Sequence, residues 1–211
     1  MKRSLSRFAM VSTVFACTVL GACQKKGDVA VSDTTAASGM AATTTDTTAS
    51  AGTVASPKSD WTDAQIIAFA WTANAGEVQA GKLAQKKATN PAVKKFAALM
   101  VSDHSRMLAD TKALAAKLAI TPDTSKDAVK DLAKAGNDQI KDLTSKKAGK
   151  DWDEDYINKQ VDDHQLVLDK LNDASQSVKS PDLKNALNES IATVQGHLTQ
   201  AKAIKDNTLK S

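Results

Sequence analysis

Apolar residues between positions 62 and 209 recur at intervals of three and four, which is the spacing of one face of an α-helix. Thr62 with Gln65 forms a capping box, and Asn90-Pro91 and Ser180-Pro181 each place a capping residue before a proline that suits the first helical position. No stretch alternates as a strand would. The pattern predicts four long helices, over residues 62–89, 91–120, 151–179 and 181–209.

A shorter helix is expected over residues 126–147, between the break at Thr121-Pro122 and Gly149. Asp151 with Glu154 three residues later is expected to cap the helix that follows. Short turns make the first two and the last two long helices antiparallel neighbours. The predicted fold is all-α: a ferritin-like four-helix bundle of two antiparallel hairpins, with a short extra helix in the crossover.

The first 22 residues have the order of a secretory signal. Three basic residues stand within the first seven positions, and the apolar run that follows is about 13 residues long, too short to span a bilayer as a helix. Leu20-Gly21-Ala22-Cys23 matches the pattern that is cleaved before a lipidated cysteine. We therefore expect residues 1–22 to be a lipoprotein signal peptide and Cys23 to carry lipid. The alternative is an ordinary secretory signal with a chance cysteine.

This leader determines the expected location of the protein. Cys17 would be removed and Cys23 acylated, which leaves no disulfide in the mature chain. An Asp directly after the lipidated cysteine is typical of retention in the inner membrane, so Gln24 favours the outer membrane. We expect an outer-membrane lipoprotein of the cell envelope that faces the periplasm and is held to the membrane by lipid on Cys23.

The rest of the chain divides into a tether and a domain. Residues 23–59 contain mainly Ala, Thr, Ser, Gly and Asp after the cysteine, and are expected to be a disordered tether. Residues 60–211 are left as one helical domain. The formal charge of +4 includes three basic residues of the leader, so the mature chain carries 25 Lys+Arg against 24 Asp+Glu. Such a balance predicts no nucleic-acid partner.

The candidate site consists of the only three histidines, His104, His164 and His197, together with Glu77. Each lies on a different predicted helix. Each is also in phase with apolar residues three or four positions away: Ala73 and Ala80 beside Glu77, Met100 and Met107 beside His104, Val161 and Leu168 beside His164, and Val194 and Ala201 beside His197.

Counting from the turns predicts that the four residues lie at similar heights. Glu77 is 14 residues before Pro91 and His104 is 13 after it, whereas His164 is 17 before Pro181 and His197 is 16 after it. The two hairpins therefore differ by three residues, or about 4.5 Å along a helix. A modest stagger would bring all four side chains together.

Three imidazoles and a carboxylate suit a divalent ion such as Zn²⁺, Cu²⁺ or Fe²⁺. Asp103 and Asp163 each adjoin a histidine; they are candidates either to orient the imidazoles or simply to face water. Two alternatives remain open. The four residues can form a purely structural hydrogen-bonded cluster, or part of the set can be exposed.

Several segments resemble the bacterial "domain of unknown function 4142" family. They are Glu77-Val78, Gly81-Lys82-Leu83-Ala84, Val93-Lys94-Lys95-Phe96-Ala97, Met100-Val101-Ser102-Asp103-His104-Ser105, Tyr156-Ile157, Asp163-His164 and His197-Leu198 with Ala201. The resemblance covers roughly residues 62–206. It implies a ferritin-like bundle of the outer membrane or periplasm and does not imply an activity. Di-iron ferritin-like proteins carry Glu-x-x-His, but Val101 and Val194 stand three residues before His104 and His197, which argues against a di-iron centre.

The sequence thus supports a non-enzymatic binding module for a metal ion or small ligand in the cell envelope. A structural or protein-interaction lipoprotein with a Glu/His core cluster is the first alternative. A metalloenzyme is the second, although four protein ligands would leave no open coordination position on a tetrahedral ion.

Overall fold

The computed structural model describes residues 59–209, and this part of the chain is all-α. The predicted signal peptide, Cys23 and the tether up to residue 58 lie outside the described residues. The described part contains five α-helices and a closing π-helical turn: α1 (Asp63–Lys87), α2 (Pro91–Lys117), α3 (Asp127–Ser145), α4 (Lys150–Ala174), α5 (Pro181–Ile204) and η1 (Lys205–Leu209).

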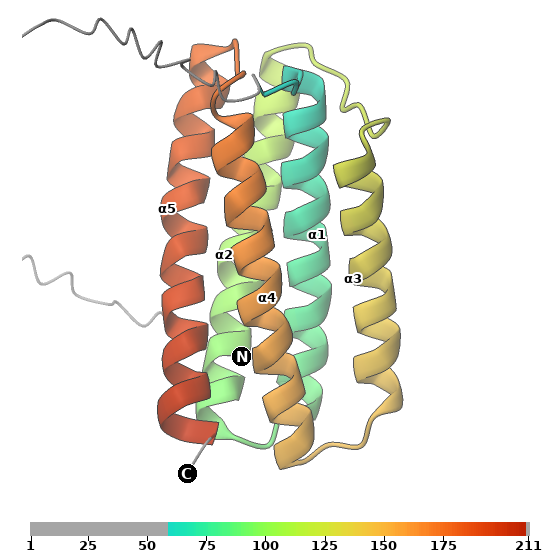
Figure 1. The fold of residues 1–211 in the computed structure, drawn as a ribbon, viewed down its shortest axis with the longest axis vertical. Helices are drawn as coiled ribbons and strands as arrows, with labels where there is room; N and C mark the ends of the chain where they lie inside the picture. Colours follow the sequence, from blue (N-terminus) through green and yellow to red (C-terminus); the bar gives the residue numbers. More distant parts are fainter. Residues whose placement is uncertain (1–58, 210–211) are drawn as a thin grey trace, which may run out of the picture. The chain divides into compact units, whose positions relative to one another are not determined.

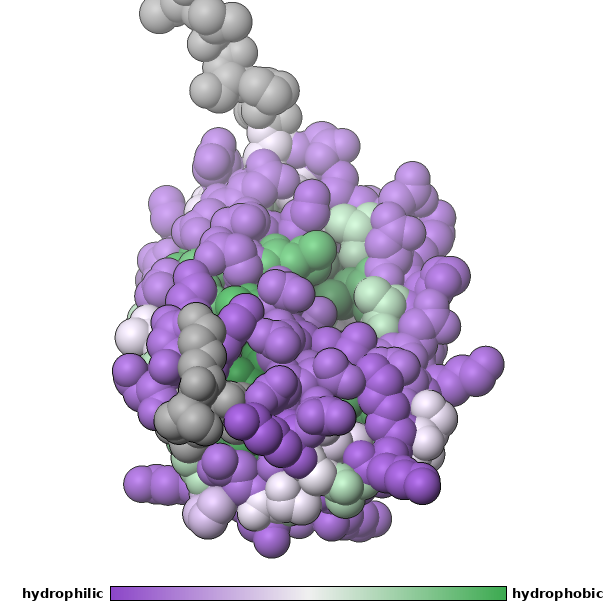
Figure 2. Space-filling model, turned by 60° about the horizontal axis from the view of Figure 1, so that its bottom comes forward, coloured by the Kyte–Doolittle hydropathy of each residue, from purple (hydrophilic) through white to green (hydrophobic). Residues whose placement is uncertain are grey.

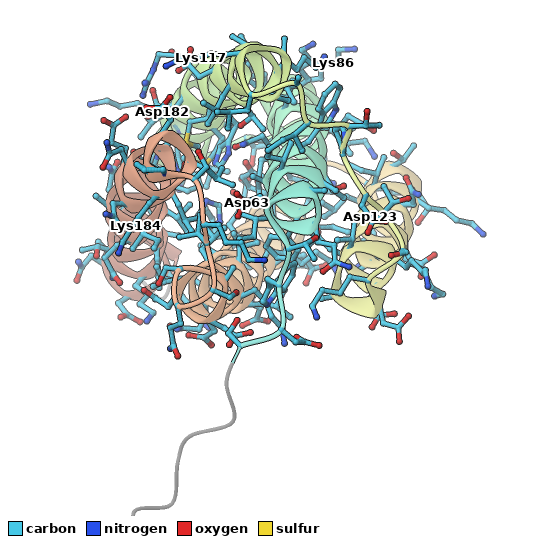
Figure 3. All side chains as sticks on the ribbon, turned by 90° about the horizontal axis from the view of Figure 1, so that it is seen from above. Asp63, Lys86, Lys117, Asp123, Asp182 and Lys184 are labelled. Atoms are coloured by element: carbon cyan, nitrogen blue, oxygen red, sulfur yellow. The ribbon has the colours of Figure 1, made fainter. Side chains whose placement is uncertain are left out.

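The helices form two antiparallel pairs with a fifth helix outside them (Figure 1). α1 packs mainly against α2 and α4 mainly against α5, while α2 also contacts α5. α3 belongs to the connection between the pairs and lies against α1. The view along the helices shows α3 outside the group made by the other four (Figure 3). The predicted helix pairs and the predicted crossover helix are therefore present.

Most of the expected helix starts are confirmed. The Thr62 hydroxyl accepts from the Gln65 backbone N–H, and the Gln65 side chain accepts from the Thr62 N–H. Asn90 and Ser180 cap α2 and α5, each followed by proline. α4 ends at Ala174, with Ser175 as its C-cap, rather than near residue 179. α2 and α5 also end earlier than predicted, at Lys117 and Ile204.

The predicted capping of α4 by Asp151 and Glu154 is wrong. The N-cap is Gly149, whose φ of 148° suits glycine, and it makes no side-chain cap hydrogen bond. The first turn of α4 instead carries Asp153, which is 1% exposed and whose carboxylate reaches the turn between α1 and α2. It accepts from the backbone N–H groups of Thr89 and Asn90 at 2.8–3.1 Å and from the Thr89 hydroxyl at 2.6 Å.

Asp63 binds the other hairpin's turn in the same way at the opposite end of the bundle. Its carboxylate accepts from the backbone N–H groups of Lys179 and Ser180, at 2.9 and 3.0 Å, in the turn between α4 and α5. Figure 3 places Asp63 at this end. The first turn of each hairpin's first helix therefore binds the turn of the other hairpin, and this reciprocal contact fixes the relative height of the two hairpins.

A polar layer divides the core into two hydrophobic clusters. One cluster contains residues such as Ile67, Phe69 and Leu171, and the other contains residues such as Met100, Trp152 and Tyr156. Between them lie all the buried polar residues of the described chain except Asp153. They are Asn74, Glu77, His104, Gln160, His164 and His197. Because buried polar groups cost free energy, this layer is where function is most reasonably sought.

The surface of the described part is predominantly polar. Figure 2 shows hydrophilic side chains over most of one face, with apolar residues visible mainly in recesses. Among described residues, Leu166 is the one large hydrophobic side chain that is well exposed, at 49%. No helix within residues 59–209 has the length and apolar character needed to cross a membrane.

Candidate metal centre

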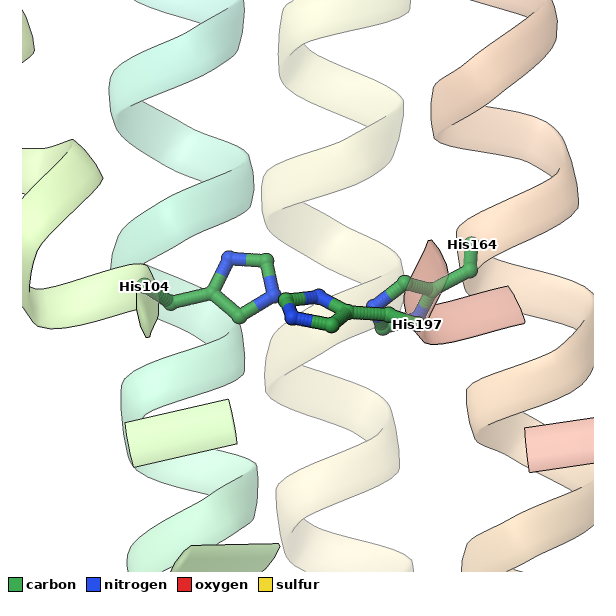
Figure 4. A group of neighbouring side chains, drawn as sticks. All are labelled: His104, His164 and His197. Atoms are coloured by element: carbon green, nitrogen blue, oxygen red, sulfur yellow. The ribbon is translucent and has the colours of Figure 1, made fainter. Parts of the chain in front are cut away.

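Three helices bring the three histidines together in the middle of the bundle. His104 comes from α2, His164 from α4 and His197 from α5, and none is more than 2% exposed. Figure 4 shows the rings converging at one height between the helices. The ring centroids are 5.0–5.6 Å apart, and one ring nitrogen of each histidine lies within 4.8 Å of the others. The predicted phase and level of the histidines therefore agree with the structure.

Each histidine contacts an oxygen atom through one of its two ring nitrogens. We call this nitrogen the outer one and the other nitrogen of the ring the inner one. His104 Nδ1 is 2.8 Å from Asn74 Oδ1, and His164 Nδ1 is 2.9 Å from the Gln160 carbonyl oxygen. His197 Nε2 is 3.0 Å from Asp103 Oδ2. Amide, backbone and carboxylate oxygens accept hydrogen bonds, so all three outer nitrogens carry the proton.

The proton positions leave one lone pair on each inner nitrogen. These atoms are His104 Nε2, His164 Nε2 and His197 Nδ1. All three are buried and have no hydrogen-bond partner among the described residues. Burying an unpartnered acceptor is costly, and three acceptors together also repel one another. A cation at their centre would satisfy all three at once.

Burial keeps the imidazoles in the form that binds metals. It lowers the pKa of His164 to about 4, and it lowers the pKa of His104 well below the usual value of 6.5. The neighbouring histidines lower the pKa of His104 further. Burial also lowers the pKa of His197, against the opposing effect of Asp103. Neutral imidazole is a metal ligand, so no histidine proton needs to leave at neutral pH.

Glu77 lies beside the histidine cluster, near the outer nitrogen of His164. Its Oε1 is 3.7 Å from His164 Nδ1, the nitrogen that already donates to Gln160, and its Oε2 accepts from Gln160 Nε2 at 2.9 Å. The compact group of ligand atoms comprises the histidines without Glu77. Burial raises the pKa of Glu77 to about 7, and the hydrogen bond from Gln160 opposes that rise. The structure therefore places Glu77 as a neighbour of one histidine rather than at their centre.

The two aspartates next to histidines have different surroundings. Asp103 contacts His197 across the α2–α5 interface rather than its sequence neighbour His104. Asp163 lines a groove between α1 and α3 with Gln139 and Glu77. Burial, and secondarily the charge of Glu77, raise the pKa of Asp163 to about 7. Of these two candidates, Asp103 is therefore the one that orients a histidine among the described residues.

Sequence reasoning missed Asn74 and Gln160, although both had a detectable signal. Asn74 stands four residues after Ala70 and three before Glu77, so it continues the apolar face of α1. It is also 17 residues before Pro91, the same count that separates His164 from Pro181. Gln160 precedes His164 by four residues, which is one helical turn.

The set of three neutral imidazoles fits a borderline divalent ion better than Mg²⁺ or Ca²⁺, which prefer oxygen. Nitrogen ligands around a tetrahedral Zn²⁺ lie about 2.0 Å from the ion and therefore roughly 3.3 Å apart. The ring nitrogens here spread up to 4.8 Å. Binding would therefore draw the rings toward one another, with each still tethered by its outer hydrogen bond.

Fold and site define the class as an all-α protein with a buried three-histidine cluster at the centre of its helices. The chain belongs to the family described as "Domain of unknown function (DUF4142)", which it matches over residues 43–204. No match was found among curated proteins or among solved structures. The family assignment agrees with the resemblance seen in the sequence and adds no activity.

Proposed function

We propose that this protein is a lipid-anchored envelope protein whose ferritin-like bundle binds one divalent transition-metal ion through His104, His164 and His197. The observation that carries this proposal is the arrangement of hydrogen-bond partners around the three imidazoles. Each outer N–H is held by an oxygen acceptor, and each inner lone pair has no partner within residues 59–209. Metal-binding histidines are typically oriented in this way, since a hydrogen bond at one nitrogen directs the other nitrogen to the ion.

The location in the proposal rests on the sequence of the leader. A signal peptide over residues 1–22 and a lipid on Cys23 would place the helical domain in the cell envelope. The tether up to residue 59 would separate the domain from the membrane surface. A ferritin-like arrangement is supported by the two antiparallel helix pairs and by the helix that connects them.

Titration of the metal-depleted, full-length chain with Zn²⁺, without a histidine tag, tests the proposal. We expect one ion per chain, and an affinity at least 100-fold weaker in the His104→Ala, His164→Ala double variant. Asp103→Asn keeps the histidines and should weaken binding about 10- to 100-fold through loss of orientation. Asp169→Asn, at an exposed position of α4, is the control and should bind as wild type. Negligible Zn²⁺ binding by the wild-type chain would refute the proposal.

A structural role for the same cluster is the second candidate. The observation that favours it is the buried chain of hydrogen bonds from His164 to Gln160 and from Gln160 to Glu77, which joins α4 to α1. A structural cluster would leave the melting temperature unchanged by a chelator. A bound ion stabilises the fold by mass action, so chelation should lower the melting temperature if the site is occupied.

A further inference from the structure

A small cavity adjoins the histidine cluster on the side nearer the start of α1. Its volume is about 20 Å³, enough for roughly one water-sized molecule. His104 and His164 both form part of its wall. The other lining residues come from four helices: Ala70, Ala73, Asn74 and Glu77 from α1, Met107 from α2, Val167 and Leu171 from α4, and Ser190 and Val194 from α5.

The Glu77 carboxylate is the one further strong metal ligand in the wall of this cavity, and it does not belong to the compact group of ligand atoms made by the three histidines. Met107, Val167 and Val194 each stand three residues from one of the histidines, so they cover the cluster one helical turn away. Asn74 Oδ1 accepts from His104, and Glu77 Oε2 accepts from Gln160. The Met107 thioether suits soft ions such as Cu(I) and is a poor ligand for Co²⁺ or Zn²⁺.

A groove between α2 and α5 leads from the surface toward this cavity. Its volume is about 70 Å³, and it shares Ala70, Met107 and Ser190 with the cavity. Arg106, Asp110 and Glu189 also line the groove. The shared residues mark the junction between the groove and the cavity, and the side chain of Ala70 contributes only a methyl group there.

We propose that an ion held by the three histidines keeps one coordination position open toward the cavity. A narrow anion such as azide reaches that position through the α2–α5 groove, with its donor atom in the cavity and its remaining atoms extending toward the groove. This inference rests on the proposed metal site, and it differs from that proposal by assigning a second, exogenous ligand. Three protein ligands with an open fourth position are typical of sites that exchange ligands, whereas structural zinc sites use four protein ligands.

Azide titration of the Co²⁺-loaded, full-length protein tests the inference, because the visible spectrum of Co²⁺ reports changes in its ligands. We expect a saturable spectral change with azide and no change with benzoate, which is too large for the cavity. Ala70→Leu should leave Co²⁺ binding unchanged and weaken azide binding at least tenfold by filling the junction. Ala135→Leu is the matched control, since Ala135 lines the separate groove between α1 and α3, and it should bind azide as wild type.

The outcomes separate the two proposals. If Co²⁺ binds and azide changes nothing, the open position is refuted while the metal site stands. Equal azide affinity in Ala70→Leu and wild type would refute the route through the groove. If the Ala70→Leu chain does not fold, a response of the wild type to benzoate equal to its response to azide refutes the small cavity as the binding place. Failure to bind Co²⁺ at all refutes the metal site and this inference together.

Discussion

At the scale of single residues, the polar layer depends on side chains whose neighbours leave little freedom. His164 donates to the Gln160 carbonyl, and the Gln160 side chain donates to Glu77.

Gly81 is constrained for a different reason, because α1 and α2 approach each other closely at this residue. A Cβ atom at Gly81 would lie 2.8 Å from Val101 Cγ2 and 3.1 Å from the Ala97 carbonyl oxygen.

Gly81→Ala should therefore destabilise the fold, by about 1–3 kcal/mol, because the added methyl group forces the helices apart. Gly76→Ala on the same helix is the matched control. A Cβ there would meet nothing within 4 Å, so the higher helix propensity of alanine should stabilise by up to about 1 kcal/mol. Urea unfolding of both variants measures the difference. Equal stability of the two variants would contradict the close contact, and Val101→Ala should partly rescue Gly81→Ala.

Glu77 gives the metal-free protein a defined pH dependence. Burial raises its pKa from 4.5 to about 7, so the folded state binds the proton more tightly than the unfolded state. The stability that this carboxyl contributes when protonated is lost as the pH rises from about 4.5 to about 7. Between pH 5 and pH 8, wild type should lose roughly 2–3 kcal/mol relative to Glu77→Gln.

Urea unfolding with a chelator present, at both pH values, measures this difference. Glu189→Gln removes an exposed carboxylate of α5 and serves as the surface control. A stability difference between wild type and Glu77→Gln that stays constant from pH 5 to pH 8 would show that Glu77 does not titrate as a buried group.

At the scale of helices, the reciprocal aspartates set the register of the two hairpins. Asp63 and Asp153 each stand 28 residues before a proline that begins the second helix of a hairpin, Pro91 or Pro181. Each carboxylate binds backbone N–H groups in the turn of the other hairpin. This contact brings His164 and His197 to the height of His104.

Asp153→Ala should cost about 2–4 kcal/mol, because it leaves the N–H groups of Thr89 and Asn90 without their charged acceptor in a buried place. Asp63→Ala should cost about 1 kcal/mol, since the Lys179 N–H it binds is exposed and can bind water. Asp151→Ala, at an exposed position beside Asp153, should have little effect. Thermal unfolding of the three variants tests this order, and a larger loss at Asp151 than at Asp153 would contradict it.

Much of the helix arrangement could be predicted because its signals are local. The capping box at Thr62, the two capping residues before proline and the apolar spacing around each histidine all act within a few residues. The role of Asp153 could not be found in this way, because its carboxylate binds a turn that is distant in sequence. Glu77 was placed on the correct face, but spacing alone cannot show which nitrogen of His164 it would approach.

At the scale of the whole molecule, the predicted anchor and the described domain have separate roles. The predicted leader and tether would determine the localisation of the protein, whereas the helical domain contains the three histidines. The domain has no helix within the described residues that would cross a membrane. Our proposal assigns membrane attachment to lipid at Cys23.

Mass spectrometry of the mature protein tests the anchor. We expect a chain that begins at Cys23 and carries acyl groups, and Cys23→Ser should abolish both the acylation and the recovery of the protein with membranes. Cys17→Ser is the matched control, because Cys17 lies in the predicted signal peptide and its loss should leave the mature mass unchanged. A mature chain without acyl groups would refute the lipoprotein assignment.

The central claim is that three histidines from three helices bind one metal ion. X-ray absorption spectroscopy of the zinc-loaded protein, without a histidine tag, tests it most directly because it reports the ligands of the ion itself. We expect scattering from three imidazoles with Zn–N distances of about 2.0 Å. A zinc ion with a single imidazole, or with oxygen ligands only, would contradict the account.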